Sequence, residues 1–369
     1  MLIKELTLHQ FKNAAEETLP FGEGVNVICG ENASGKTNLL EAMFFFAAGK
    51  SFRGCKDREL IRFGEEEARA ELRFFRGVEN AVETKMGVLL RRSQKRQITV
   101  EGQPVRKLAE YLGLFRAVIF TPDHLHLVKG APENRRRFLD LAICQSFPRY
   151  AASVHEYGRL LQQKNAMLKT ESPDKQLLAV YNERMATSAA VITLNRFRYL
   201  ENLAKEAQEV QKEMSAGAEV LDLRYSSQVG AKEGQTAEEL RDGYRVLFES
   251  RAETEIRRGT ALFGPQKDDF TVLINKKDAR LFGSQGQQRS AVLALKLGEG
   301  ELSKRLTGEY PVFLLDDILS ELDANRRGYI LSHLSGRQVI LTGCEPELPD
   351  AGVSRKILVK NGVARALSS

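Results

Sequence analysis

The stretch GENASGKT, residues 30–37, constrains the fold of the whole chain. It fits the pattern G-x-x-x-x-G-K-[ST], with the apolar run VNVIC before it and the helical run KTNLLEAMFFFAAG after it. A strand, a glycine-rich turn and a helix in this order predict a phosphate-binding loop, because backbone N–H groups and the helix N-terminus then point at phosphate oxygens. The alternative is a plain strand-to-helix turn. The expected phosphate contacts are Gly30, Glu31, Asn32, Ala33, Ser34, Gly35, Lys36, Thr37 and Asn38.

A second informative stretch is PVFLLDDILSELD, residues 311–323. Its apolar run predicts a strand buried on both faces, with two carboxylates at the carboxyl end, where ligands of parallel sheets gather. We expect Asp316 and Thr37 to hold Mg²⁺, Asp316 through water. We expect Lys36 to reach the outer phosphates and Asp317 to orient or deprotonate the attacking water. Without the phosphate loop, the same letters would describe a strand followed by a helix cap.

Composition narrows the class of protein. The 369 residues carry a formal charge of +6, which suits a polyanionic partner but also fits a solvated basic face. No apolar run approaches the roughly 18 residues that span a bilayer, and the N-terminus lacks a signal-peptide core, so we expect a cytoplasmic protein and no membrane partner. Cysteines 29, 55, 144 and 344 lie far apart, which favours structural thiols over a metal site.

The order of the patterns predicts an α/β fold with an inserted helical arm. Residues 1–125 are strand-rich apart from the helix after the phosphate loop, and residues 126–245 are largely helical, with breaks at Pro148 and Pro173. Residues 246–369 alternate helix and strand, which favours a parallel sheet covered by helices. We therefore predict an N-terminal β-rich lobe, an arm and a C-terminal lobe.

The polar cluster GSQGQQRS, residues 283–290, precedes an apolar-periodic helix. Ser284 could simply cap that helix. A helix N-terminus with an unshielded backbone at Gly286 is also a good anion site.

These pieces, taken together, resemble known proteins. A phosphate loop, a large insertion, SQGQQ, LLDD and SELD follow the order found in the heads of the ABC and SMC ATPases. The match extends over nearly the whole chain to the RecF family of bacterial recombination mediators. It rests on QFKN, GVNVICGENASGKTNLLEA, KSFRGCKDRELIRFG, GAPENRRRFLDLAICQSFPRYAASVHEYGRLLQQKNAMLK, SQGQQRSAVLALKL and PVFLLDDILSELDANRR.

The resemblance implies a P-loop ATPase head that forms a homodimer around two ATP molecules with Mg²⁺. The signature residues Ser284, Gln285, Gly286 and Gln287 would then contact the partner's nucleotide in trans, and Asp323 would lie at the dimer seam. It further implies a weak, DNA-stimulated ATPase that acts as a switch. Such a protein works with RecR and RecO to load RecA at gapped DNA, and it supports replication forks and the SOS response.

Some positions depart from the pattern. Transporter cassettes usually have Glu where this chain has Asp317, and a carboxylate one methylene shorter predicts slow turnover. Cassettes also often place a His after the last core strand, whereas Thr342 and Gly343 stand here. The stretch GPQKDD resembles the family's GPHRDD, with Gln266 and Lys267 at the variable places, and Asp268 and Asp269 could be a mere turn. Asp123 in TPDHL is a metal-side candidate or a capping residue.

Three basic clusters are candidate DNA contacts, although each could equally be a solvated face. The first two are the stretches FRGCKDR, residues 52–58, and RRSQKRQ, residues 91–97. They supply the predicted DNA-binding residues Arg53, Lys56, Arg58, Arg91, Arg92, Lys95 and Arg96. The third, Arg135–Arg137, begins a predicted helix, where the dipole disfavours cations and an acidic neighbour is expected.

Three other classes of protein compete with this interpretation. A transporter's nucleotide-binding subunit shares the motif order, but it should have an LSGGQ-type signature and the missing His. A small P-loop kinase would need neither SQGQQ nor the arm, and a structural SMC protein needs hundreds of heptad residues.

Overall fold

The computed structural model describes residues 1–77, 81–107, 110–344, 352–360 and 362–367. It divides into two compact units, the first formed by Met1–His126 with Val292–Ser369 and the second by Leu127–Ala291. The first boundary falls one residue from the predicted one, whereas the arm extends to Ala291 and not to residue 245. The physical reason is that the later elements of the arm pack on its earlier ones, as described below.

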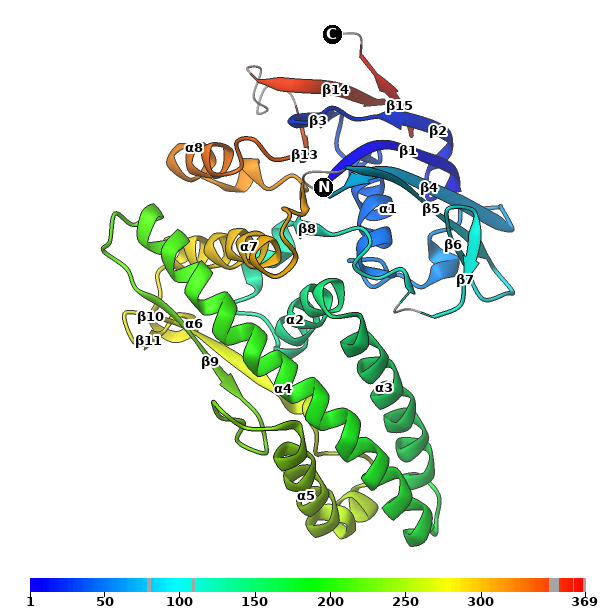
Figure 1. Ribbon diagram of the computed structural model, residues 1–369, viewed down its shortest axis with the longest axis vertical. Coiled ribbons are helices and arrows are strands. Elements are labelled where there is room, and N and C mark those ends of the chain that lie inside the picture. The colour runs from blue at the N-terminus through cyan, green and yellow to red at the C-terminus, as the bar shows by residue number, and fades with distance from the viewer. Residues whose placement is uncertain (78–80, 108–109, 345–351, 361, 368–369) are drawn as a thin grey trace. The chain divides into compact units, whose positions relative to one another are not determined.

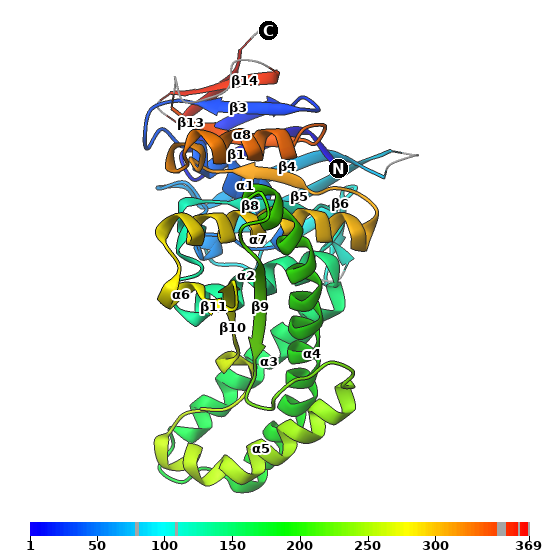
Figure 2. The same ribbon diagram turned by 90° about the vertical axis from the view of Figure 1, so that its left-hand side faces the viewer.

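A mostly parallel sheet forms the centre of the first unit (Figure 1). Its strands are, in spatial order, β15 (Val363–Ala366), β14 (Val353–Lys360), β3 (Val25–Cys29), β13 (Val339–Gly343), β12 (Val312–Leu315) and β8 (Ala117–Phe120). Only β15 is antiparallel to its neighbour. Strands β8, β12 and β13 are buried throughout, as expected of apolar strands covered on both faces. Figure 2 shows β14 beside β3, its parallel neighbour, and β14 pairs with β15 on its other side, with Asn361 outside the described residues.

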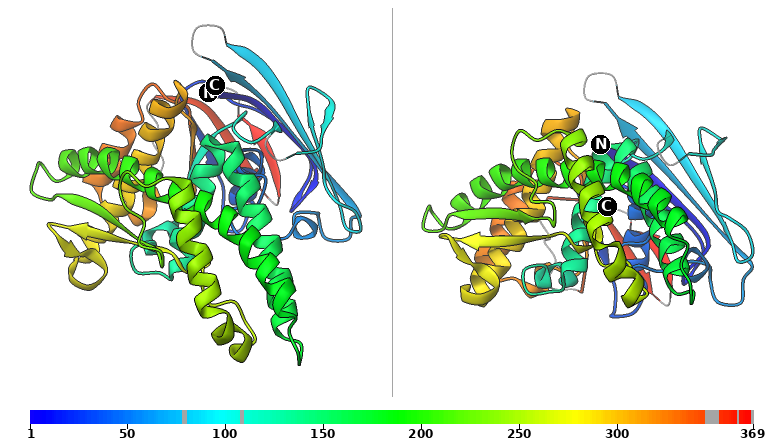
Figure 3. Two further views of the ribbon diagram at one scale, coloured as in Figure 1. Left: turned by 60° about the horizontal axis from the view of Figure 1, so that its bottom comes forward. Right: turned by 90° about the horizontal axis from the view of Figure 1, so that it is seen from below.

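A second, antiparallel sheet belongs to the same unit, and its blue-to-cyan strands twist as a layer in Figure 3. The strands are β2 (Ala14–Pro20), β1 (Leu2–Phe11), β4 (Glu67–Arg76), β5 (Val82–Arg91), β6 (Gln97–Val100) and β7 (Gln103–Val105). Helix α1 (Lys36–Ala48) contacts β4 of this sheet and β8 and β13 of the other. Because α1 is covered from both sides, it is buried from Leu39 to Ala48, and the residues of that stretch are apolar except Glu41.

The second unit is the predicted arm. Its helices and strands are α2 (Pro132–Ser146), α3 (Pro148–Leu168), α4 (Lys175–Met214), β9 (Leu221–Ser226), α5 (Ala237–Arg258), β10 (Asp269–Ile274), β11 (Lys277–Asp278) and α6 (Ala279–Phe282). Pro148 opens α3, and Asp174 after Pro173 caps α4, so both predicted breaks are confirmed. Helix α5 packs on α4, and β10 pairs with β9, which is why these elements stay with the arm.

Helix α7 (Gln285–Thr307) begins in the second unit and continues into the first. The first unit also contains α8 (Ala324–His333) and the short helices η1 (Asp57–Glu59), η3 (Pro122–His126) and η5 (Leu319–Glu321). Among the described residues, no helix combines the length and apolarity that crossing a membrane requires.

Candidate nucleotide site

The phosphate loop connects β3 to α1, as its sequence predicts. Both of its glycines lack room for a side chain. A Cβ on Gly30 would lie 2.3 Å from the carbonyl oxygen of Val359, and a Cβ on Gly35 would lie 2.0 Å from Nδ2 of Asn13. Gly35 caps α1 with a φ of 114°, a conformation that favours glycine. The loop therefore needs glycine at both fixed positions for steric reasons.

Asn13, in the turn between β1 and β2, fastens the loop from outside. Its Nδ2 donates to the carbonyl of Ser34 at 2.9 Å, and its Oδ1 accepts from Nδ2 of Asn38 at 2.6 Å. The phosphate-loop pattern assigns Asn13 no role, because Asn13 lies more than twenty residues before Ser34 in the sequence. Its place in QFKN, one of the stretches that carry the family resemblance, is the available signal.

Lys36 is 4% exposed, and its ammonium group points back into the loop. Nζ donates to the carbonyls of Gly30 at 2.8 Å and Glu31 at 3.1 Å, and it lies 3.8 Å from Sγ of Cys344. A buried ammonium held among carbonyl oxygens can exchange these bonds for phosphate oxygens without being desolvated again. A cavity of about 1100 Å³ lies beside this loop.

The predicted cation ligands meet at the carboxyl edge of the parallel sheet. Thr37 donates its hydroxyl to Oδ1 of Asp316 at 2.8 Å, and Thr342 donates to the same oxygen at 2.9 Å. Burial raises the pKa of Asp316, although both hydroxyls oppose that shift. A hydroxyl and a buried carboxylate are hard oxygen ligands, and a nearby cation would favour the charged carboxylate. The donor set therefore fits Mg²⁺.

The sequence pattern marks Thr342 only as a position after the last core strand where His is often found. The structure gives it a structural task, because its hydroxyl also accepts the backbone N–H of Asp317 at 2.9 Å. Asp317 has a φ of 48°, in the left-handed region that non-glycine residues rarely adopt. Thr342 thus fixes both acidic residues where the chain turns sharply after β12.

The signature cluster caps its own helix in the single chain. Ser284 Oγ accepts the N–H of Gln287 at 3.2 Å, and Gln287 Oε1 accepts the N–H of Ser284 at 2.9 Å. This is the reciprocal capping arrangement, so the simpler of the two interpretations holds for the isolated chain. Ser284 and Gln285 are exposed, whereas Gly286 and Gln287 are partly buried. Their role in trans stays a prediction.

Two further acidic candidates also lie at helix starts. Asp323 caps α8 and pairs with Arg326, and the hydrogen bond from the Arg326 backbone N–H, together with its guanidinium, lowers the pKa of Asp323. Asp123 is exposed in the first turn of η3. The seam role of Asp323 and the metal-side role of Asp123 stay predictions.

Most of the predicted DNA-binding arginines have partners within the chain. Arg53 donates to Oδ1 of Asn38 at 3.3 Å, Arg91 pairs with Glu67 at 3.1 Å, and Arg96 pairs with Asp57 at 3.3 Å. Arg92 donates to the carbonyl of Glu65 at 2.7 Å. Lys56, Arg58 and Lys95 are exposed. Part of each cluster therefore forms hydrogen bonds or ion pairs within the chain.

The third basic cluster has the acidic neighbour that its position at a helix start required. Arg135, 4% exposed, donates Nε to Oδ1 of Asp269 at 2.6 Å and Nη2 to Oδ2 at 2.8 Å. Arg136 donates to the carbonyl of Asp268 at 2.8 Å. These contacts tie the start of α2 to the start of β10.

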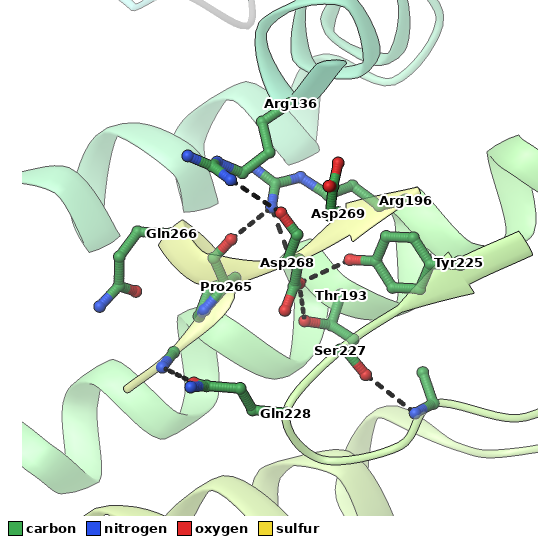
Figure 4. Close-up of polar contacts among 12 residues, drawn as sticks. Arg136, Thr193, Arg196, Tyr225, Ser227, Gln228, Pro265, Gln266, Asp268 and Asp269 are labelled. Atoms are coloured by element: carbon green, nitrogen blue, oxygen red, sulfur yellow. Dashed lines mark hydrogen bonds and ion pairs between the residues drawn. The ribbon is translucent and has the colours of Figure 1, made fainter. Parts of the chain in front are cut away.

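The stretch GPQKDD is more than a turn, contrary to the simpler interpretation of its acids. Asp268 is fully buried and accepts hydrogen bonds from the hydroxyls of Tyr225 at 2.6 Å and Thr193 at 3.1 Å (Figure 4). Arg196 of α4 lies 3.7 Å from the same carboxylate and donates to the carbonyl of Pro265 at 2.7 Å. Burial raises the pKa of Asp268 to about 6.

Comparison with known proteins gives concordant results. A family model described as the RecF/RecN/SMC N terminal domain matches residues 2–352. The DNA replication and repair protein RecF of Halalkalibacterium halodurans is 40% identical, with 91% of each chain covered. That of Geobacillus kaustophilus is 41% identical, with 90% of this chain and 89% of the relative covered.

Solved structures agree with these relatives. A recombination mediator RecF–ATP structure of the RecFOR pathway superposes with a TM-score of 0.90 at 34% identity, covering 100% of this chain and 98% of that one. The RecF–ATPrS structure gives 0.91 at the same identity, covering 99% and 98%. An SMC head bound to part of ScpA, 16% identical with a TM-score of 0.56, shares the fold. The predicted ABC- and SMC-type head is thereby confirmed.

Proposed function

The chain belongs to the RecF family, and we propose that it is an ATP-operated DNA-binding protein of replication and recombinational repair. The observation that carries this proposal is the contact between Thr37 of the phosphate loop and Asp316 of β12 at 2.8 Å. A phosphate cradle and a hard-oxygen cation ligand meet there, as a nucleotide with Mg²⁺ requires. Relatives that are 34% identical over almost their whole length bind ATP and ATPrS.

In the proposed mechanism the loop supplies most of the nucleotide affinity. Lys36 exchanges the carbonyls of Gly30 and Glu31 for the outer phosphates, and the backbone N–H groups that follow Gly30 face the phosphate oxygens. When bound, Mg²⁺ offsets the charge of the phosphates. Thr37 and, through water, Asp316 would hold that cation, with Thr342 keeping Asp316 in position.

Asp317 is the proposed base or water-orienting group. Its backbone is fixed by Thr342, which restricts how far the short side chain can reach. Because Asp is one methylene shorter than the Glu of fast cassettes, we propose slow hydrolysis that is stimulated by DNA and serves to release the dimer.

We further propose that two copies close around two ATP molecules. Ser284, Gln285, Gly286 and Gln287 of one copy would then meet the γ-phosphate held by the other, with Asp323 at the seam. The exposure of Ser284 and Gln285 supports this, because a second copy can reach them without unfolding either chain. DNA, RecR, RecO and RecA are the proposed partners, and the cytoplasm is the proposed location.

Molar mass measured by light scattering tests the composite site. Wild type should be monomeric without nucleotide and with ADP, and dimeric with ATP and Mg²⁺. Lys36→Met and Ser284→Arg should stay monomeric. The control Ser172→Arg, at an exposed serine between α3 and α4, should dimerise like wild type. An ATP-binding wild type that never dimerises would leave Ser284 as a helix cap alone.

A further inference from the structure

Gln288 follows the four signature residues and, unlike its polar neighbours, is buried. It is 5% exposed, whereas Ser284 and Gln285 are exposed. A primary amide removed from water costs free energy unless it finds hydrogen-bond partners inside the protein. The sequence pattern ends at Gln287 and gives Gln288 no contact with a nucleotide. Its burial indicates a task within the chain.

The Gln288 amide ties helix α6 to the start of α7. Nε2 donates to the carbonyl of Ala279 at 2.8 Å and to the carbonyl of Gly283 at 3.0 Å, so both of its N–H groups are used. Ala279 is the first residue of α6, and Gly283 caps its other end. Because a four-residue helix leaves most of its carbonyls without intrahelical partners, this side chain supplies donors at both ends of α6.

The junction between the two helices is compact. A Cβ on Gly283 would lie 2.6 Å from the carbonyl oxygen of Ala279, and the N–H of Gly283 donates to that oxygen at 3.1 Å. The φ of Gly283 is −76°, which any residue can adopt, so glycine is needed for the close approach alone.

The peptide unit that joins Gly283 to Ser284 is held at both of its polar ends. Its carbonyl accepts from Gln288 Nε2 at 3.0 Å, and its N–H donates to Gln287 Oε1 at 2.9 Å. Because a peptide unit is planar, these two bonds fix its orientation and the direction in which Ser284 continues from it. The Ser284 hydroxyl accepts the N–H of Gln287 at 3.2 Å, which uses an oxygen lone pair and leaves the hydroxyl hydrogen for another acceptor.

We propose that Gln288 is a positioning residue for the signature. By fixing the Gly283–Ser284 peptide, it holds Ser284 in the orientation that meets the γ-phosphate of a second copy, and it does not touch the nucleotide itself. The junction is then preorganised, so it need not be ordered when two copies close. This inference rests on the proposal that the signature contacts ATP in trans.

Gln288→Met keeps the size of the side chain and removes its N–H donors. The loss should weaken each signature contact about threefold to tenfold. Since the dimer contains two signatures, the dissociation constant of the ATP-bound dimer should rise by roughly 10- to 100-fold, as measured by light scattering over a range of protein concentrations with Mg²⁺. Calorimetry should give an unchanged affinity for ADP, because the phosphate loop belongs to the first unit.

Gln145→Met is the matched control. Gln145 of α2 is 6% exposed and donates Nε2 to the carbonyl of Leu141 at 3.2 Å, so its replacement also removes a buried amide donor from the second unit. This variant should lose similar thermal stability and dimerise like wild type. Equal weakening of the dimer in both variants would reflect a general loss of stability and would overturn the inference.

A double-mutant cycle shows whether Gln288 acts through Ser284. Once Ser284→Ala has removed the hydroxyl, adding Gln288→Met should raise the dissociation constant of the dimer by less than about threefold. Fully additive effects would overturn the inference, as would a single variant Gln288→Met that dimerises like wild type.

Hydrogen exchange tests the fixed junction in the wild type. Without nucleotide, the amides of Gly283 and Ser284 should exchange at least about tenfold more slowly than in an unstructured chain. Exchange at the unprotected rate would overturn the inference even if Gln288→Met did not fold. A wild type that binds ATP and never dimerises would instead refute the composite site, and this inference with it.

Discussion

Replacing Arg135 with methionine would remove the clamp that joins α2 to β10. The guanidinium makes two parallel hydrogen bonds to Asp269 and donates Nη1 to the carbonyls of Leu127 at 3.1 Å and Gly130 at 2.8 Å. Methionine fills a similar volume but takes the cationic donor away from the Asp269 carboxylate, which keeps the N–H of Phe270 at 2.8 Å, and from these carbonyls. The loss is therefore electrostatic and leaves the packing almost unchanged.

The size of the effect follows from burial. Removing one partner of a buried pair costs about 3–5 kcal/mol. The Asp269 side chain keeps 31% of its surface exposed, so water and the N–H of Phe270 partly solvate the carboxylate that has lost its cation, and we expect the lower end, about 3 kcal/mol. At about 2–4 °C per kcal/mol for a unit of this size, the melting temperature of the arm should fall by roughly 6–12 °C.

Differential scanning calorimetry of the full chain measures this shift. Arg135→Lys keeps the positive charge but not the two parallel hydrogen bonds of the guanidinium, so its melting temperature should lie between those of wild type and Arg135→Met. Arg149→Met, at an exposed position of α3, is the matched control and should melt like wild type. A double-mutant cycle with Asp269→Asn should give a coupling of at least about 1.5 kcal/mol. If Arg135→Met lowers the melting temperature by less than about 2 °C, or if the effects of Arg135→Met and Asp269→Asn simply add, the proposed clamp is refuted.

Three further predictions concern other buried groups. Because burial raises the pKa of Asp268 to about 6, its contribution to stability is complete below about pH 4 and is lost as pH rises through 6. The difference in unfolding free energy between wild type and Asp268→Asn should therefore change by about 3 kcal/mol between pH 4 and 7. A difference that does not change with pH would contradict this prediction. Glu255→Gln removes the negative charge that lies 2.6 Å from the fully buried Lys164 ammonium, whose bond to Asn182 Oδ1 at 2.7 Å is to a neutral group, so it should lower the free energy of unfolding by about 3–5 kcal/mol. Adding Lys164→Met should make the loss smaller, as measured by thermal unfolding. Asp316→Asn should raise the Mg²⁺ concentration needed for ATPase activity by roughly 10- to 100-fold, measured by Mg²⁺ titration, while ATP binding in EDTA is kept.

The parts of the site that the sequence predicted are the local ones. The strand, the loop and the helix around Lys36 are contiguous, so their spacing alone predicts the geometry. The breaks at Pro148 and Pro173 are equally local, because proline removes a backbone donor wherever it stands. Asp316 was predictable because it ends an apolar strand, whose type the sequence indicates directly.

The strand order was the part that local patterns did not contain. Strand β13 lies between β3 and β12, so Thr342 near its end donates to the same oxygen of Asp316 that accepts from Thr37 of the phosphate loop. Asn13 reaches the loop through the β1–β2 turn in the same way. The local sequence around Thr342 and Asn13 indicates no role for either residue. Only pairing between distant strands brings the two side chains to the site.

Pairing between distant segments also decides which basic residues are available to DNA. The ion-pair partners of Arg91 and Arg96 lie 24 and 39 positions away, so the sequence showed clusters of charge without their counterions. Neutralising DNA phosphates releases condensed cations, and a guanidinium already paired with a carboxylate must first break that pair. Arg58 and Lys95 are exposed and, across the described residues, form no side-chain hydrogen bond or ion pair. If this lobe binds DNA as proposed, these two residues can contribute their full charge, whereas Arg91 and Arg96 chiefly hold the lobe in shape.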